Sequence, residues 1–404
     1  MHWLDIWQNL KRIKMAEETQ TKINEKNSLV AEKRVSILVR IDSLDNDFSS
    51  CVKSLSNQIL DDMEILFLVT IPSNEDAEGL SEEALIQSKV KEKHRQEKLE
   101  FLDDYAKKDS RIKIVRTKIS DYGKIMNAAI KFSKGEYIGI IRPTDYVDPE
   151  MYIELFALAK KHDADIVRSN YYEHQNDSER LHESFLAEDA DKVINPVDDT
   201  SIFYQPPVVG CGLYKKEFIM SRHILFIEDF AADNQDDTFS FKSLAASERL
   251  VVTNKAYLHH VEVTGLIEKT KKKKAKKKRD ADEDGQEDSS QVSDSAANVD
   301  IFLINKEYAE AEKYLKKYNG WETYGCIFQA VKFASYFYTM LHLDDRDLEK
   351  FMLRARAEFH DADENDKISK RYFPKEHWKT LQAILNYPPR IFLRTIKKQR
   401  KNAV

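Results

Sequence analysis

The sequence has few cysteines, no long apolar run and no excess of positive charge. Its three cysteines among 404 residues, Cys51, Cys211 and Cys326, lie far apart and fit neither a metal-ligand spacing nor a disulfide framework, so a reducing, cytoplasmic setting is expected. No stretch approaches about 18 consecutive apolar residues, which excludes an evident membrane-spanning helix. The first residues lack the apolar centre and cleavage site of a signal peptide. The formal net charge of −6 gives no reason to expect nucleic acid as a partner.

The first 14 residues are predicted to form one amphipathic helix. Its apolar side contains Trp3, Ile6, Trp7, Leu10 and Ile13. Two tryptophans beside basic residues suit an anchor at a membrane surface. A helix docked on its own protein or on a partner is the alternative. Residues 15–33 are polar and are expected to be a linker, so 1–33 form the first segment of the chain.

Apolar runs and helical stretches alternate from residue 34 to about residue 170. Buried strands are predicted at 34–41, 64–69, 111–116, 137–141 and 165–169. Helices are predicted at 48–58, 81–108, 127–133 and 151–162. Strands that are apolar throughout and are separated by helices indicate a Rossmann-like α/β domain with a mainly parallel sheet and right-handed crossovers.

The stretch 133–151 is the most informative part of this domain. Gly139 inside its strand indicates a close approach by another group, and Pro143 ends the strand because proline cannot donate to a sheet. In open α/β sheets, ligands lie at the carboxyl ends of such strands. The corner from Arg142 to Asp145 is therefore where chemistry is expected.

After residue 170 the alternation of apolar runs and helical stretches is less regular. Residues 171–207 are polar and are expected to be irregular. A strand or turn followed by a helix is predicted at 208–221, a helix at 236–246 and a strand at 250–258. Residues 269–279 then carry nine basic side chains and 280–288 carry six acidic ones, so 266–300 are expected to be a disordered insert. A basic run can bind anionic lipid or nucleic acid, but its acidic neighbour can neutralise it, which favours a solvated loop.

Residues 301–404 are predicted to form a small all-α C-terminal domain. Helices are expected at 307–318, 324–341, 345–359 and 374–385, with Phe328, Phe333, Tyr336 and Phe337 in the core. The basic tail at 390–401 contains apolar residues that would suit a second membrane-surface helix.

Several segments resemble family-2 glycosyltransferases, which have the glycosyltransferase A fold. The matching segments are 51–58 (CVKSLSNQ), 106–115 (AKKDSRIKIV), 134–138 (KGEYI), 145–152 (DYVDPEMY) and 163–167 (DADIV). The resemblance covers about residues 34–265, which makes 34–265 the expected glycosyltransferase A-like domain. It implies a nucleotide-sugar donor and an acceptor that is a glycan, a lipid-linked sugar or a protein.

The resemblance also implies where donor and metal would bind. The family holds Mn²⁺ or Mg²⁺ with an Asp-x-Asp motif, because a diphosphate leaves readily only when its charge is neutralised. Those positions here are Arg142, Pro143 and Thr144, and only the following Asp145 is acidic. The implied cofactor is therefore either absent or a divalent cation on Asp145 and His260. The donor-binding residues implied by the alignment are Arg40, Asp42, Asn127, Arg142 and Asp145.

One further family feature concerns the catalytic base. Inverting members use an aspartate at the start of a late helix to take the proton of the acceptor hydroxyl. Asp236 matches that position and Asp237 follows it, so both are candidate catalytic residues. The alternative is that the two acids only stabilise the start of the helix.

Two hypotheses of function follow. In the first, the chain is a divergent inverting glycosyltransferase of surface polysaccharide or glycoprotein assembly, in which Arg142 neutralises the donor diphosphate without a metal. In the second, it is a catalytically degenerate subunit that binds and supports a partner glycosyltransferase. Either protein is expected in the cytoplasm, at the inner face of the membrane if residues 1–14 bind its surface.

Overall fold

A computed structural model describes residues 33–44, 47–71, 82–175, 178–230, 235–261, 301–388, 391–394 and 396. The predicted amphipathic helix at 1–14, the linker up to residue 32 and the charged insert at 266–300 lie outside the described residues.

The described part of the chain is built on one ten-stranded sheet. Its strands are β1 (Val35–Ile41), β2 (Met63–Thr70), β3 (Ile112–Thr117), β4 (Tyr137–Ile141), β5 (Tyr146–Val147), β6 (Ile166–Gln175), β7 (Ser178–His182), β8 (Val193–Ile194), β9 (Gly212–Lys215) and β10 (Leu250–Val261). The main order is β3-β2-β1-β4-β9-β6-β10-β5, with β7 paired to β6 and β8 paired to β10. Strands β1, β2, β3, β4, β6 and β10 run in one direction, and β5, β7, β8 and β9 run in the opposite direction. The predicted α/β class with a mainly parallel sheet is confirmed.

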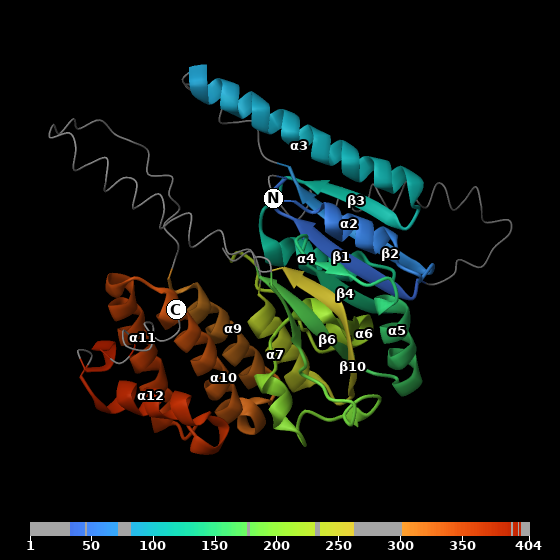
Figure 1. Cartoon of the computed structure of the whole chain (residues 1–404). Helices are drawn as coiled ribbons and strands as arrows, with labels where there is room; N and C mark the ends of the chain where they lie inside the picture. The colour runs from blue at the N-terminus through green and yellow to red at the C-terminus, as the bar shows by residue number, and fades with distance from the viewer. Residues whose placement is uncertain are drawn as a thin grey trace.

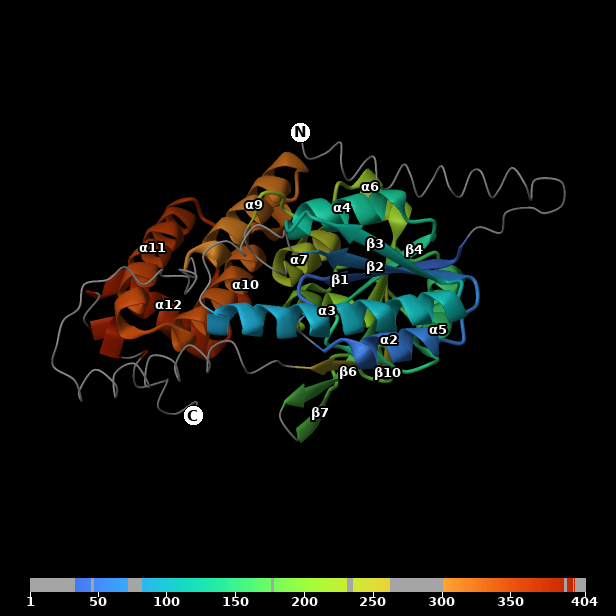
Figure 2. The same cartoon turned by 90° about the horizontal axis from the view of Figure 1, so that it is seen from above.

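Helices cover both faces of this sheet. They are α2 (Ser49–Ser56), α3 (Glu82–Lys108), α4 (Tyr122–Phe132), α5 (Met151–His162), α6 (Lys216–Ser221) and α7 (Asp236–Ala246). Figure 2 shows α4 and α6 on one face and α2, α3 and α5 on the other. The apolar side chains divide accordingly into two buried clusters, because alternate strand residues point to opposite faces. The carboxyl ends of β1 and β4 lie side by side, because these two strands pair in parallel, and the candidate site lies at this end of the sheet.

The packing around Gly139 leaves no space for a side chain at the centre of the sheet. A methyl group at its Cα would lie 2.6 Å from the Cδ1 atom of Ile37 and 3.3 Å from a ring carbon of Tyr152. The close approach predicted from this glycine is confirmed, because neighbouring strand and helix occupy the space that a side chain would need.

The structure differs from the sequence-based expectation at two places in this domain. Helix α4 begins at Tyr122 rather than Asn127, because the side chain of Asp121 accepts the backbone N–H of Lys124 at 2.7 Å and caps it. The expectation of irregular structure at 171–207 was wrong. Strand β6 continues to Gln175, and β7, β8 and the 3-10 helix η2 (Thr200–Tyr204) follow.

The C-terminal part is helical, as predicted, and packs beside the sheet (Figure 1). It contains α9 (Leu303–Lys317), α10 (Trp321–His342), α11 (Asp345–Glu364), the 3-10 helix η4 (Lys370–Tyr372) and α12 (Lys375–Asn386). The side chains of Phe328, Phe333 and Tyr336 are fully buried. In the tail, Phe392 and Ile396 are also buried in the same apolar cluster, so these two residues are not available to a membrane surface.

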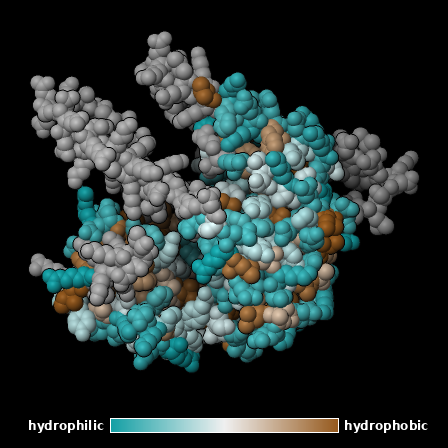
Figure 3. All heavy atoms as spheres, viewed as in Figure 1, coloured by the Kyte–Doolittle hydropathy of each residue, from teal (hydrophilic) through white to brown (hydrophobic). Residues whose placement is uncertain are grey.

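On the face in Figure 3, the described residues are mostly hydrophilic, with scattered apolar spots. Among the helices in the described ranges, none is both long and apolar enough to cross a bilayer. The three cysteines carry free thiols.

Candidate active site

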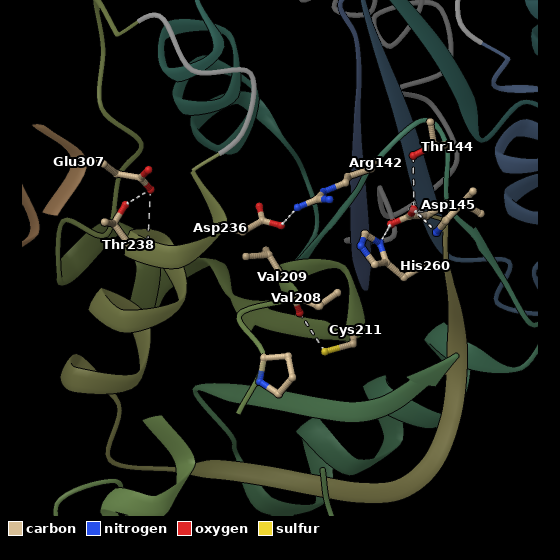
Figure 4. A network of polar contacts seen from close by, with 12 residues as sticks. Arg142, Thr144, Asp145, Val208, Val209, Cys211, Asp236, Thr238, His260 and Glu307 are labelled. Atoms are coloured by element: carbon tan, nitrogen blue, oxygen red, sulfur yellow. Dashed lines mark hydrogen bonds and ion pairs between the residues drawn. The ribbon is translucent and has the colours of Figure 1, made fainter. Parts of the chain in front are cut away.

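The candidate site lies where β4 ends. The polypeptide turns at Arg142, and the backbone N–H of Asp145 donates to the carbonyl of Arg142 at 3.1 Å to close that turn. Arg142 reaches across to the first turn of α7, where its Nη2 lies 2.7 Å from Oδ2 of Asp236 (Figure 4). Burial opposes the charge of this guanidinium, but the carboxylates of Asp236 and Asp145 raise the pKa of Arg142 above its ordinary value. The fold thus joins two predicted site residues that are 94 positions apart.

Asp145 is held on the other side of the same turn. Its side chain is buried, its Oδ2 lies 3.0 Å from Nδ1 of His260, and its Oδ1 accepts the backbone N–H of Val261 at 3.0 Å. These contacts tie the corner after β4 to the end of β10. The hydroxyl of Thr144 adds a long contact of 3.4 Å to Oδ1.

This donor set does not fit a resident magnesium or manganese ion of the Asp-x-Asp kind. Such hard cations need several oxygen ligands. Here one carboxylate and one imidazole are available, and they already contact each other and the backbone. The guanidinium of Arg142 places a fixed positive charge beside them. The corner therefore places a cationic side chain, Arg142, beside the carboxylates of Asp145 and Asp236.

The start of α7 does not use Asp236 as its cap. The N-cap residue is Gln235, whose side chain instead holds the backbone of Ile227 through contacts of 2.6 and 2.9 Å. The hydroxyl of Thr238 donates to Oε1 of Glu307 at 2.8 Å. Asp236 lies in the first turn of α7, where a negative charge interacts favourably with the helix dipole. Its carboxylate points to Arg142 (Figure 4).

Two more acids lie behind Asp236. Burial and the charge of Asp236 raise the pKa of Asp237 to about 6, although Arg142 opposes this effect. Burial and the charge of Asp237 raise the pKa of Glu307 to about 7, and the hydrogen bonds from Thr238 lower it. The three carboxyl groups therefore interact with one another, and Asp237 and Glu307 retain protons to higher pH than free side chains.

A cavity of about 170 Å³ opens beside Asp237. Its wall comes from both the α/β part and the C-terminal helices. The lining residues are Phe203, Tyr204, Gln205, Pro206, Pro207, Asp237, Ser240, Phe241, Leu244, Val331, Ala334 and Ser335. The wall is largely apolar and aromatic, and Gln205, Asp237, Ser240 and Ser335 are among its polar residues.

Arg40 joins the site from the end of β1. Its guanidinium lies over the ring of Tyr122, 5.5 Å from the centroid, and its Nη2 donates to the carbonyl of Ser120. Its Nε is buried and has no hydrogen-bond partner among the described residues. The charge of Asp236 raises the pKa of the Tyr122 hydroxyl, and the charges of Arg142 and Arg40 lower it. Both arginines therefore lie near Tyr122.

The remaining two predicted donor-binding residues are placed differently. The amide of Asn127 is used within the protein: its Nδ2 donates to the carbonyl of Phe226 and to Glu228, both at 3.0 Å, and its Oδ1 accepts the N–H of Phe226 at 2.9 Å. Asp42 accepts the backbone N–H of the adjacent Ser43 at 2.9 Å and is half-buried. The structure brings Arg40, Arg142, Asp145, Asp236, Asp237 and His260 to this end of the sheet, whereas it directs the amide of Asn127 into the fold.

Sequence reasoning missed Glu307. It lies in α9, 69 residues after Thr238, and no local motif marks it. The only available signal was an acidic side chain on the apolar side of a predicted helix, where a charge needs a partner.

Several known proteins are similar to this chain. The sequence model described as Glycosyl transferase family 2 matches residues 92–219. EpsJ, an uncharacterized glycosyltransferase of Bacillus subtilis (strain 168), is 25% identical over 245 residues, which are 58% of this chain and 63% of EpsJ. EpsH of the same organism, a provisionally named glycosyltransferase, is 23% identical over 59% of this chain and 64% of its own length. The chain thus matches just under two thirds of the length of these relatives.

A solved structure of TarS residues 1–349 from S. aureus, in complex with UDP-GlcNAc, is 14% identical to this chain. The superposition covers 87% of this chain and 90% of TarS 1–349, with a TM-score of 0.47.

Proposed function

From the match of the Glycosyl transferase family 2 model to residues 92–219 and the similarity to EpsJ, we propose that the chain is a divergent inverting glycosyltransferase of this family. It transfers a sugar from a nucleotide-sugar donor to a hydroxyl group of a glycan, a lipid-linked sugar or a protein. The observation that carries the proposal is the contact of 2.7 Å between Arg142 and Asp236 at the carboxyl end of β4. Arg142 stands where the family's Asp-x-Asp motif would bind a metal ion, and Asp236 stands where the family has its catalytic base.

The proposed reaction is a single displacement at the anomeric carbon. The acceptor oxygen attacks that carbon while its proton passes to a carboxylate oxygen of Asp236. The bond from the anomeric carbon to the diphosphate oxygen breaks on the opposite face, which inverts the configuration. The electron pair of the broken bond leaves with the diphosphate, and the guanidinium of Arg142 neutralises the charge that develops there.

Arg142 and Arg40 suit this role for a physical reason. A guanidinium stays protonated at all working pH values and offers paired donors that match phosphate oxygens. Arg40 also has a buried Nε that finds no partner in the described part of the chain, and a bound anion would satisfy it. The proposal therefore assigns both arginines to the donor diphosphate and requires no divalent cation.

The cavity beside Asp237 is proposed as part of the acceptor side. It adjoins α7, the helix that carries the proposed base, and its aromatic and proline wall suits the apolar face of a sugar ring. We also propose that the whole protein acts in surface polysaccharide or glycoprotein assembly at the inner face of the cell membrane.

A second candidate function is a degenerate subunit that supports a partner glycosyltransferase. Two observations favour it. Arg142 and Asp236 neutralise each other in the absence of donor, and both oxygens of Asp145 are engaged by His260 and the backbone. A binding experiment separates this function from the first one.

The experiment is a calorimetric titration of the full chain with UDP, GDP and their nucleotide sugars. Each ligand is tested with Mn²⁺, with Mg²⁺ and with a chelator, on the native chain, Arg142→Gln and Arg34→Gln. Arg34 is the matched control, because it lies at the opposite end of β1 in a comparable, partly exposed ion pair with Asp62 at 3.3 Å.

Binding that survives the chelator and is lost only in Arg142→Gln supports the metal-independent transferase. Binding that requires metal contradicts the role given to Arg142. Absence of binding in all conditions contradicts the transferase and favours the degenerate subunit.

A further inference from the structure

A second cluster of ligating side chains lies on the outer strands of the sheet, apart from Arg142 and Asp236. It consists of His174 on β6, Glu179 on β7 and His259 on β10, whose ligating atoms all lie within 4.8 Å of one another. We propose that these three residues bind a divalent transition-metal ion of the zinc class. This inference does not depend on the proposed transferase function.

The register of three adjacent strands brings the cluster together. Glu179 lies directly opposite His174 in the β6–β7 hairpin. His259 lies opposite Tyr172 on β6. His174 is two residues after Tyr172 on the same strand, so His259 and His174 are diagonal neighbours. Opposite and diagonal pairs on one face of a sheet are within reach of each other's side chains. Figure 2 shows β7 beside the ends of β6 and β10.

The distances suit a tetrahedral ion. Two nitrogen ligands at about 2.0 to 2.1 Å from Zn²⁺ lie roughly 3.3 Å apart in tetrahedral geometry. Nε2 of His174 is 3.5 Å from Oε2 of Glu179 and 2.8 Å from Nδ1 of His259. Opening the contact between the two histidines by about half an ångström would admit the metal. The protein supplies three ligands and leaves the fourth position to water.

The surroundings orient the two imidazole rings. Nε2 of His259 lies 3.3 Å from Oδ1 of Asp148, and a proton held there leaves the Nδ1 lone pair facing His174. The ring of His259 is stacked between Tyr146, at 4.4 Å, and Tyr172, at 4.9 Å. The hydroxyl of Tyr146 lies 3.3 Å from Nε2 of His174. A carboxylate behind a metal-binding histidine is the usual second partner in zinc proteins.

This site is separate from the corner at Asp145. His259 and His260 are consecutive on β10, so their side chains point to opposite faces of the strand. His260 contacts Asp145, whereas His259 contacts Asp148. Two nitrogens and one carboxylate oxygen select Zn²⁺, Co²⁺ or Ni²⁺ over Mg²⁺ and Mn²⁺. The ion would fasten the β6–β7 hairpin to β10 at the exposed end of the sheet.

The test uses the full chain without a histidine tag, stripped of metal by dialysis against a chelator. Co²⁺ is titrated while its visible absorption is recorded, and Zn²⁺ is titrated by calorimetry. The same measurements are made on His174→Gln, Glu179→Gln and His162→Gln. His162 is the matched control, because it also pairs with a carboxylate, Asp191, at 2.7 Å and is similarly exposed.

The proposal expects one Zn²⁺ per chain, a tetrahedral Co²⁺ spectrum and a rise in melting temperature with Zn²⁺. His174→Gln and Glu179→Gln should bind at least tenfold more weakly, whereas His162→Gln should bind like the native chain. Glu179 is exposed enough that its substitution should leave folding intact, which a melting curve without metal checks. Unchanged binding in both cluster variants, or no stoichiometric Zn²⁺ binding by the native chain, would overturn the proposal.

Discussion

Replacing Asp236 by asparagine should tighten the binding of a nucleoside diphosphate while abolishing transfer. The substitution keeps the shape of the side chain but removes its charge. The guanidinium of Arg142 then loses the anion that it contacts at 2.7 Å and becomes fully available to a diphosphate. Binding and catalysis should therefore change in opposite directions, which a simple loss of folding would not produce.

The size of the effect follows from the exposure of the pair. Two unit charges about 4 Å apart near a protein surface attract each other by about 4 kcal/mol before other costs are counted. The side chain of Arg142 is 38% exposed and that of Asp236 is 12% exposed, so solvent screens much of this attraction. A partly exposed ion pair retains about 1 kcal/mol after desolvation and side-chain ordering. Removing the competing carboxylate should thus tighten diphosphate binding roughly five- to tenfold.

The assay is calorimetric titration of UDP and GDP in the presence of a chelator, on the native chain, Asp236→Asn, Arg142→Gln and the double variant. Arg142→Gln should lose the binding, and the double variant should resemble it, because the gain in Asp236→Asn acts through Arg142. Transfer or donor hydrolysis, measured on the same samples, should fall by about 10² to 10⁴ in Asp236→Asn, as expected for the loss of a general base.

One result would refute this reasoning directly. If Asp236→Asn bound the diphosphate no better than the native chain while Arg142→Gln still bound it, Arg142 would not contact the diphosphate. The ion pair would then be a structural link between β4 and α7 only.

Three further predictions concern stability and are tested by urea unfolding. Gly139→Ala should lower the free energy of unfolding by about 1 to 3 kcal/mol, because the new methyl group would overlap Ile37. Asn127→Ala should lower it by about 1 to 3 kcal/mol, because the buried backbone of Phe226 loses both of its partners. Burial raises the pKa of Glu307 from 4.5 to about 7 in the folded chain. Between these two pH values the native state holds a proton that the unfolded state has released. The free energy of unfolding should therefore fall as the pH rises towards 7. Glu307→Gln should reduce that fall by on the order of 2 kcal/mol between pH 5 and pH 8, and an unchanged slope would contradict the assignment.

The sequence determined the elements whose signals are local. The strands β1, β2 and β4 are mostly apolar. Helix α5 was predicted with its observed bounds, because the periodicity of a helix can be read directly from neighbouring residues. The start of α4 was missed although Asp121 gives a capping signal in the sequence. The family resemblance likewise depended on short continuous segments, and it indicated the corner from Arg142 to Asp145 as the candidate site.

Tertiary structure alone decided the pairings between distant segments. Strand β9 lies between β4 and β6 and runs antiparallel to both of them. It pairs with only a few residues of each, so nothing in its own sequence predicts this position. The polar stretch after residue 170 gave no strand signal because the ends of β6 and β7 are largely exposed, and their pairing is made by backbone hydrogen bonds that any side chain permits.

The site shows the same division. The sequence named Arg142, Asp145, Asp236 and His260 as candidates, but not that Arg142 contacts Asp236 or that Asp145 contacts His260. It gave no indication that Glu307 meets Thr238. Contacts between residues this far apart depend on how the helices and strands pack, and the charge and protonation of each group depend on the neighbours that packing supplies.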